Sequence, residues 1–406
     1  MMEQQVPGAG ERPPFRERAV SYRPTRAEIS ETAIRGNVRR FVRSLANGCH
    51  LMAVVKADGY GHGMAEVAAL ALEEGAERIG VAIPEEAFAL RYAGVTAPIL
   101  ILGYTPPSAV ETAVRFDVAM TVYTDEVIRE IAVVCERVQQ AAAIHLKLDT
   151  GMSRLGVATE EEANRLAALA SRSQWITLEG VYTHFACASE EDPAMTERQF
   201  QRYRAIVAGV ERRHGVIPIK HCCNTAATMK FPHMHLDMAR VGIGLYGLSP
   251  LAHPEPARGL PPLLPALALK TAVANIVSLP AGGAVSYGGT HRAPHDSRIA
   301  VLPIGYADGL PRSLSNKGYV LVLGQRVPIV GNICMDQTMV DVSEVPGAII
   351  GTEVILIGAS EQGAVITADE LAHAAGTIHY EIVTRIGARV PRTIVQAPGR
   401  GACTQE

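Results

Sequence analysis

One lysine of this 406-residue chain lies where its amine is suited to covalent chemistry. Lys56 closes the apolar run 51–56 (L-M-A-V-V-K), and a turn with Gly59, Gly61 and Gly63 follows it. Burial favours the neutral form of a lysine, and a neutral amine attacks carbonyl carbon. Most lysines at strand ends are ordinary surface residues, but the adjacent glycines let the backbone approach a ligand closely. Lys56 is therefore a candidate nucleophile.

Four more polar motifs each follow an apolar run further along the chain. They are K-L-D-T-G-M-S-R-L-G (147–156), Y-T-H-F (182–185), H-C-C-N-T-A-A (221–227) and A-R-V-G-I-G-L-Y-G (239–247). The third places Thr225 at the start of a short helix, where hydroxyl and amide groups suit a phosphate. The fourth contains G-x-G-x-x-G, but L-S-P-L-A-H-P follows it instead of the helix that a dinucleotide site needs. We therefore reject a Rossmann-type site.

Alternating strands and helices must position these motifs. Apolar runs predict strands at 51–56, 79–83, 98–102, 117–122, 143–149, 179–184, 217–223 and 237–243. Helical spacing predicts helices at 27–43, 63–74, 84–93, 125–140, 159–172 and 193–213. Continuous apolar runs are typical of parallel strands buried on both faces. Eight such units within about 220 residues predict a (β/α)8 barrel. A doubly wound sheet is the alternative, because strand order is invisible in the sequence.

The pattern changes after a proline-rich linker at 249–265. Short runs separated by Gly, Pro and Asn predict strands at 267–279, 298–304, 319–323, 326–330, 337–342 and 353–357, with one helix at 367–375. This predicts a C-terminal, mainly-β domain. We therefore expect a disordered tail at 1–22, a barrel at 23–262 and a β-domain at 263–406.

Composition limits the possible partners. Hydrophobic residues make up 48% of the chain, charged residues 19%, and the formal net charge is −3. This profile predicts a soluble protein that binds neither nucleic acid nor membrane. Seven scattered cysteines without a C-x-x-C motif predict free thiols in a reducing cytoplasm. His233 and His235 have no companions with metal-ligand spacing, so no metal site is expected.

The chain resembles the alanine racemase family from about Arg23 to about Val395. Lys56 matches the lysine that holds pyridoxal 5'-phosphate (PLP), and the β-domain motifs V-S-Y-G-G, P-I-G-Y-A-D-G, G-N-I-C-M-D-Q and H-Y-E-I match in order. The resemblance implies a barrel followed by a β-domain, and a homodimer whose sites are shared across the interface. It also implies an enzyme that interconverts L- and D-alanine in the cytoplasm and supplies D-alanine for peptidoglycan.

The resemblance also implies a role for each matching residue. It implies that Lys56 and Tyr287 are the two catalytic bases and that Lys147 is the candidate for carbamylation. Cofactor contacts are implied for Lys56, Tyr60, Arg154, His184, Asn224, Thr225, Arg240, Gly242, Ile243 and Tyr380. Substrate contacts are implied for Arg154, Tyr306, Met335 and Asp336.

Arg240, which the resemblance puts at the pyridine nitrogen, separates the competing functions. A guanidinium donates hydrogen bonds but does not readily release its proton, so the ring nitrogen stays neutral and the cofactor is a weaker electron sink. This favours racemisation over decarboxylation of basic amino acids. A serine or broad-specificity racemase is a second alternative, against which Tyr306 and Tyr380 favour the small alanine pocket. A non-catalytic PLP carrier is a third, against which the complete β-domain with Tyr287 speaks.

Overall fold

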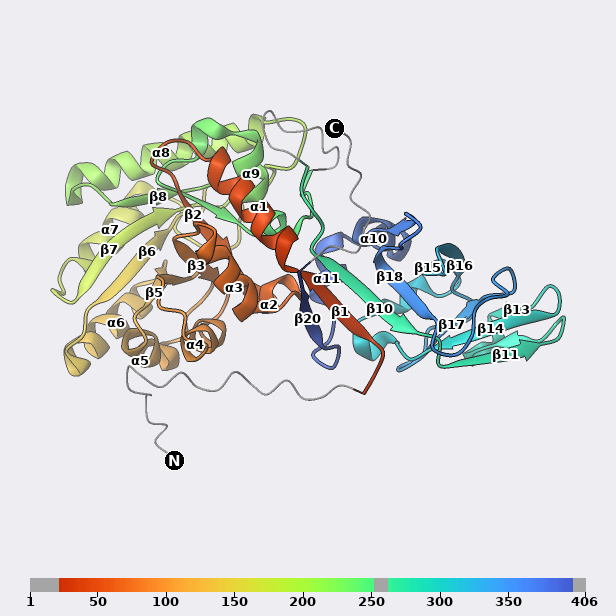
Figure 1. The fold of residues 1–406 in the computed structure, drawn as a ribbon. Helices are drawn as coiled ribbons and strands as arrows, with labels where there is room; N and C mark the ends of the chain where they lie inside the picture. The colour runs from red at the N-terminus through yellow and green to blue at the C-terminus, as the bar shows by residue number, and fades with distance from the viewer. Residues whose placement is uncertain (1–21, 252–261, 397–406) are drawn as a thin grey trace.

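The computed structural model describes residues 22–251 and 262–396. Almost all of the tail expected at 1–22, part of the linker and the last ten residues lie outside the described residues. Figure 1 shows two domains side by side, the barrel on the left and the β-domain on the right, with β1, β10 and β20 where they meet. No helix in the described ranges combines the length and the apolar character needed to cross a membrane.

Eight parallel strands form the barrel, in the spatial order β8-β7-β6-β5-β4-β3-β2-β9. They are β2 (His50–Val54), β3 (Arg78–Val81), β4 (Ile99–Ile101), β5 (Val118–Val122), β6 (Ala142–Lys147), β7 (Ile176–Tyr182), β8 (Ile219–His221) and β9 (Met238–Val241). Between the two ends of this order, the Asp237 amide donates to the Lys220 carbonyl at 3.1 Å and the Arg240 amide to the Cys223 carbonyl at 3.0 Å. The predicted barrel is confirmed, and the doubly wound alternative is wrong.

Helices cover the outside of this barrel (Figure 1). They are α1 (Glu31–Ser44), α3 (Met64–Glu73), α4 (Pro84–Tyr92), α5 (Pro107–Arg115), α6 (Asp125–Val138), α7 (Glu160–Ala170), α8 (Ala194–His214) and α9 (Thr225–Lys230). In α6, for example, the buried stripe is Val127, Ile128, Ile131 and Val134.

The first helix differs from its prediction at 27–43. Arg26–Ser30 forms strand β1, in which Ala27 and Ile29 are buried, and the helix starts only at Glu31. The Ser30 side chain accepts a hydrogen bond from the Ala33 amide at 3.2 Å, which caps the helix there. Apolar spacing alone could not locate this start, because residues 27 and 29 fit a strand while the residues after them fit a helix.

The C-terminal domain is built mainly from two sheets, which are antiparallel except for the parallel pair β1 and β20. The larger has the order β16-β15-β18-β10-β1-β20, with β19 beside β18, and the smaller has the order β11-β14-β17. The larger sheet comprises β16 (Gln325–Pro328), β15 (Tyr319–Val322), β18 (Glu353–Ala359), β10 (Leu267–Ala272), β1, β20 (Arg392–Val395) and β19 (Val365–Ile366). The rest are β11 (Asn275–Leu279), β14 (Ser297–Leu302), β17 (Thr338–Asp341), and the pair β12 (Ala284–Val285) and β13 (His291–Arg292). The run expected at 267–279 is therefore two strands in different sheets.

Two features of this domain bear on the site. Strand β1 precedes the barrel in the sequence, and it pairs with β10 and β20, which follow the barrel. The polypeptide therefore enters and leaves the barrel through the larger sheet of the β-domain. The helix expected at 367–375 is α10 (Ala368–Ala375), and a second helix, α11 (His379–Thr384), follows it. Helix α11 packs against the loop that carries Lys56.

Candidate active site

Lys56 begins a turn with an unusual backbone. It is the first residue of α2 (Lys56–Tyr60), and Ala57, Asp58, Gly59 and Tyr60 all have left-handed φ values, of 52°, 53°, 62° and 52°. Each non-glycine residue in this region costs about 1 kcal/mol. Such strain persists only where the surroundings impose it, and it clusters at functional sites.

Contacts from both domains impose this conformation. One carboxylate oxygen of Glu86 accepts from the Ala57 amide at 2.7 Å, and the other accepts from the Ala82 amide at 2.8 Å. From the β-domain, Arg392 donates to the Gly61 carbonyl at 3.0 Å. A Cβ at Gly61 would lie 2.0 Å from the Val383 carbonyl of α11. Gly61 thus admits the backbone of the second domain, a closer approach than any other residue type would allow.

The electrostatics of Lys56 suit a nucleophilic amine. Burial, followed by the positive charge of Arg154, lowers the pKa of Lys56, while Glu86 acts in the opposite direction. Arg154 itself lies on the loop after β6. This loop is held by Asp149, whose side chain accepts from the amides of Gly151 and Met152, both at 2.9 Å. The structure therefore brings Lys56 and Arg154 together at the carboxyl ends of the barrel strands.

Lys147, the last residue of β6, is buried among cations. Its Nζ lies 4.3 Å from the centroid of the Tyr182 ring. Burial, and then the charges of Arg240 and Arg154, lower the pKa of Lys147 well below its ordinary value. No carboxylate in the described residues forms an ion pair with it. Burial of this kind favours the neutral amine, which is the nucleophilic form.

Arg240, on β9, is almost fully buried and held at several points. Its Nη1 lies 2.9 Å from His221 Nδ1, and its Nη2 donates to the carbonyls of Thr183 at 2.7 Å and Cys222 at 3.1 Å. The same Nη2 lies 3.4 Å from Nδ1 of His184. Burial, then Arg240, lowers the pKa of His184 well below its ordinary value, so this imidazole is neutral.

A third group of predicted residues lies where β8 and β9 end. The Thr225 hydroxyl accepts from the Gly242 amide at 3.0 Å, and Asn224 caps α9 by accepting from the Ala227 amide at 3.0 Å. Ile243, the next residue, is buried and opens a short 3-10 helix. Amides, a hydroxyl and a helix start together provide donors for a phosphate group.

Two tyrosines border this third group. A Cβ at Gly242 would lie 2.4 Å from the Tyr60 hydroxyl, so this tyrosine packs directly on the backbone of Gly242. The ring of Tyr380, from α11, lies 6.3 Å from that of Tyr60. Both the barrel and the β-domain therefore contribute to this corner of the site.

The four remaining predicted residues lie apart from Lys56, in the β-domain. Tyr287 is 75% exposed, Met335 53% and Tyr306 40%, so one chain does not bury them in a site. Asp336 pairs with Arg389. In the described ranges none of these side chains forms a hydrogen bond or ion pair with a barrel residue. The single chain thus assembles the barrel half of the predicted site and leaves the other half exposed.

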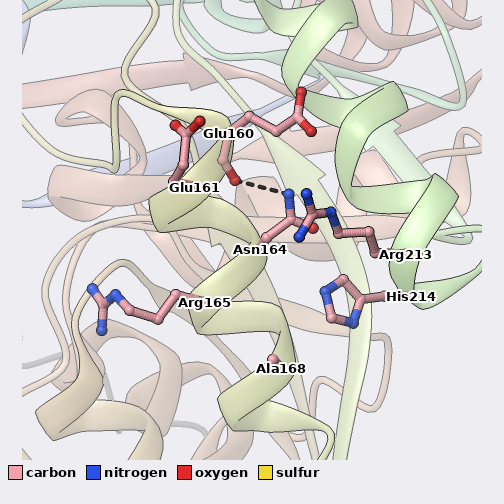
Figure 2. Close-up of a pocket in the computed structure, with 7 residues that line it drawn as sticks. All are labelled: Glu160, Glu161, Asn164, Arg165, Ala168, Arg213 and His214. Atoms are coloured by element: carbon pink, nitrogen blue, oxygen red, sulfur yellow. Dashed lines mark hydrogen bonds between the residues drawn. The ribbon is translucent and has the colours of Figure 1, made fainter.

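A separate surface pocket lies between α7 and α8, on the outer helical layer of the barrel (Figure 2). Its lining is polar and includes Glu160, Asn164 and Arg213. No residue predicted for catalysis or cofactor binding lines it.

The sequence reasoning missed three polar residues inside the barrel, His145, Glu179 and His221. They link Arg240 to the far end of the barrel through hydrogen bonds. His145 lies two residues before Lys147 on β6, so both side chains point into the barrel. That spacing was the only signal available in the sequence.

The fold and the site define a two-domain protein, in which a barrel with a half-buried lysine after its first strand is followed by a mainly-β domain. Family models for the N-terminal and C-terminal domains of alanine racemase match residues 29–250 and 266–394. The chain therefore belongs to the alanine racemase family, which is PLP-dependent.

Individual relatives match along almost the whole chain. Alanine racemase 2 of Oceanobacillus iheyensis is 48% identical over 92% of this chain and 93% of its own length. The crystal structure of alanine racemase from Bacillus anthracis with bound L-Ala-P has a TM-score of 0.88 at 38% identity, covering 95% of this chain and 98% of that one. Alanine racemase from D-cycloserine-producing Streptomyces lavendulae has a TM-score of 0.87 at 37% identity, covering 93% and 98%.

Proposed function

We propose that this chain interconverts L- and D-alanine, with PLP held on Lys56. The observation that carries the proposal is the half-buried amine of Lys56 at the mouth of an alanine racemase-type barrel. Partial burial and the charge of Arg154 lower the pKa of this amine. PLP, when bound, supplies an electron sink that makes the Cα proton of alanine removable. The chain's own residues must then bind the substrate and move that proton.

The proposed roles follow the contacts of each group. Thr225, Gly242 and Ile243 bind the phosphate with Tyr60, Asn224 and Tyr380 around it. Arg240 would donate to the pyridine nitrogen, and its buried, donor-only guanidinium would keep that nitrogen unprotonated. His184 stays neutral beside it. Arg154 binds the phenolic oxygen and the substrate carboxylate, and a carbamate formed on Lys147 would orient its guanidinium.

Two groups on opposite faces exchange protons with the substrate: one removes a proton from Cα, and the other delivers a different proton to the opposite face. With PLP and substrate bound, the free amine of Lys56 would serve one face of Cα, that of D-alanine. Tyr287 serves the opposite face, that of L-alanine. Two bases on opposite faces racemise the substrate without turning it over.

The exposure of Tyr287 supports a homodimer as the active unit. A base must lie within hydrogen-bond reach of the proton that it removes. Tyr287 is 75% exposed on its own chain, as are large parts of Tyr306 and Met335. We infer that Tyr287, Tyr306, Met335 and Asp336 complete the site of a second copy. Tyr306 and Tyr380 would narrow the pocket to alanine rather than serine.

The cellular setting is part of the same proposal. Free, scattered cysteines fit a reducing cytoplasm, and D-alanine made there would serve peptidoglycan synthesis. Among the described residues all six cysteines are free.

Borohydride reduction followed by peptide mapping tests the cofactor site. Reduction of the purified protein is expected to fix the cofactor to Lys56, and chiral analysis of product from L-alanine is expected to show D-alanine. Attachment at Lys147, a buried lysine whose pKa is also lowered, would overturn the assignment. Product that remains purely L-alanine would overturn the activity.

A further inference from the structure

A continuous chain of hydrogen bonds runs from Arg240 through the inside of the barrel. After the link from Arg240 to His221, His221 Nε2 lies 2.9 Å from His145 Nδ1. His145 Nε2 in turn lies 2.9 Å from a carboxylate oxygen of Glu179. Arg78 ends the chain by donating to both oxygens of Glu179, at 3.0 and 2.8 Å. Because Arg78 is the first residue of β3, the chain leads from the candidate site toward the opposite end of the barrel.

The groups at the two ends of this chain of hydrogen bonds determine which nitrogen carries the proton in each imidazole. A guanidinium only donates and a carboxylate only accepts. His221 therefore accepts at Nδ1 from Arg240 and carries its proton on Nε2, which donates to His145. His145 likewise carries its proton on Nε2, which donates to Glu179. Burial lowers the pKa of both imidazoles, so each holds a single proton.

Glu179 is a firmly ionised acceptor. Burial raises the pKa of its carboxyl group, but the hydrogen bonds from His145 and Arg78 outweigh burial and bring the pKa to about 2. Arg240, in contrast, has no carboxylate among its hydrogen-bond partners in the described residues. The chain through the two histidines is therefore the route by which the buried guanidinium reaches an anion.

A bulge and a glycine in strand β7 make room for these hydrogen-bonded side chains. Ile144 pairs with Leu178 and His145 with Gly180, so Glu179 is an extra, bulged residue on β7. A bulge re-aims a side chain, and bulges are frequent next to active sites. A Cβ at Gly180 would lie 2.3 Å from Nδ1 of His145, so the glycine makes room for the imidazole.

Tyr182 orients His221, which lies in the middle of this chain of hydrogen bonds. Its ring stacks on that of His221 at 4.6 Å with an interplanar angle of 9°. The Tyr182 hydroxyl is itself anchored, 2.9 Å from the Leu102 carbonyl and 2.8 Å from the Thr121 hydroxyl. The plane of the His221 ring is therefore set independently of Arg240.

We propose that Glu179 and His145 are positioning residues that hold His221 in the tautomer that accepts from Arg240, and so keep Arg240 aimed at the cofactor ring. The inference rests on the proposed role of Arg240. Loss of the Glu179 acceptor would let His145 move its proton to Nδ1, which would force a proton onto Nδ1 of His221. Two donors, His221 and Arg240, would then face each other, and the guanidinium would shift.

The test combines tautomer measurement with a double-mutant cycle. Glu179→Gln replaces one oxygen by an NH2 donor, and His145→Asn breaks the chain. Nitrogen-15 NMR of histidine-labelled protein without substrate should show the His221 proton on Nε2 in the wild type and a mixture of tautomers in Glu179→Gln. Racemisation should show kcat lowered on the order of tenfold at unchanged KM, the size typical when an outer partner of a functional group is lost.

The double variant decides between positioning and general stability. If Glu179 acts through His145, adding Glu179→Gln to His145→Asn should change neither kcat nor the His221 tautomer further. Glu111→Gln, which breaks an exposed pair with Arg115 on α5, is the matched control and should change nothing. Additive effects of the two substitutions would overturn the proposal, as would an unchanged His221 in Glu179→Gln.

Gly180→Ala provides a second route if Glu179→Gln does not fold. It displaces the His145 ring without altering a polar group, and it should disturb the His221 tautomer and kcat in the same direction. A normal tautomer with displaced His145 would overturn the proposal. The NMR result does not depend on the cofactor's chemistry. If the His221 tautomer responds to Glu179→Gln in a protein that does not racemise alanine, the proposed function is contradicted. The inference that Glu179 and His145 position His221 would still hold.

Discussion

Lys147 and Tyr182 face each other inside the barrel, with the Lys147 amine 4.3 Å from the centre of the Tyr182 ring. This amine forms no ion pair with a carboxylate in the described residues. Burial, and then the charges of Arg240 and Arg154, lower its pKa well below its ordinary value, which favours the neutral form. Only a neutral amine adds to CO2, with loss of one proton, to form a carbamate.

We therefore expect a carbamate carbon signal in carbon-13 NMR after equilibration with labelled bicarbonate. The signal should be absent in Lys147→Ala and present in Lys220→Ala, since Lys220 is paired with Glu211 and Asp237. Acidification should reverse the modification, because protonation of the amine drives release of CO2. A signal that persists in Lys147→Ala would place the modification elsewhere.

Gly242→Ala should weaken both folding and cofactor binding. The added Cβ would lie 2.4 Å from the Tyr60 hydroxyl, and overpacking of this kind costs about 1–3 kcal/mol. Because Tyr60 and the Gly242 amide both belong to the proposed phosphate site, PLP titration should show reduced affinity as well.

Gly36→Ala is the matched control for this prediction. Gly36 lies within α1, and its new Cβ would meet atoms no closer than 3.4 Å. A helical glycine replaced by alanine should stabilise the chain by about 0.5–1 kcal/mol with PLP affinity unchanged. Urea unfolding measures the free energy of unfolding of both variants. Equal stability of Gly242→Ala and Gly36→Ala would contradict the packing argument.

Arg240→Glu should divert turnovers from racemisation to transamination. A carboxylate at the pyridine nitrogen would favour a protonated ring. The negative charge of the substrate would then be delocalised for longer, so that a carbon other than Cα could be protonated. Pyruvate formed per alanine racemised should rise in Arg240→Glu and stay low in Arg240→Lys, which keeps the positive charge. The same ratio in both variants would mean that the charge at residue 240 does not control the outcome.

The sequence predicted which barrel residues lie together, for a physical reason. In a parallel barrel the carboxyl ends of the strands meet at one face, so polar motifs that follow successive strands must converge. Five predicted residues lie as this rule requires: Lys56, Lys147, His184, Thr225 and Arg240. The order of strand ends was enough to group them.

Other features depend on contacts that no local pattern reveals. Strand β1 pairs with β10 and β20, which are more than 200 residues away in sequence. Glu179 points to His145 because of a bulge in β7, and the register that creates a bulge is set by both strands. Nor does the strained turn at Ala57 follow from local preference, since Glu86 and α11 impose it.

The central claim is that Lys56 and Tyr287 serve opposite faces of the substrate. Tyr287→Phe should strongly slow proton removal from L-alanine and leave removal from D-alanine by Lys56. Net racemisation must fall in both directions, because a catalyst cannot change the equilibrium constant. The asymmetry therefore shows only in isotope exchange.

Exchange of the α-hydrogen in deuterated water, followed by NMR for each enantiomer separately, tests this claim most directly. We predict that the Tyr287→Phe variant exchanges D-alanine with retention of configuration. Its exchange of L-alanine should fall by about 10²–10⁴-fold, the usual cost of losing one acid–base group. Equal exchange of both enantiomers by the variant would contradict the two-base account.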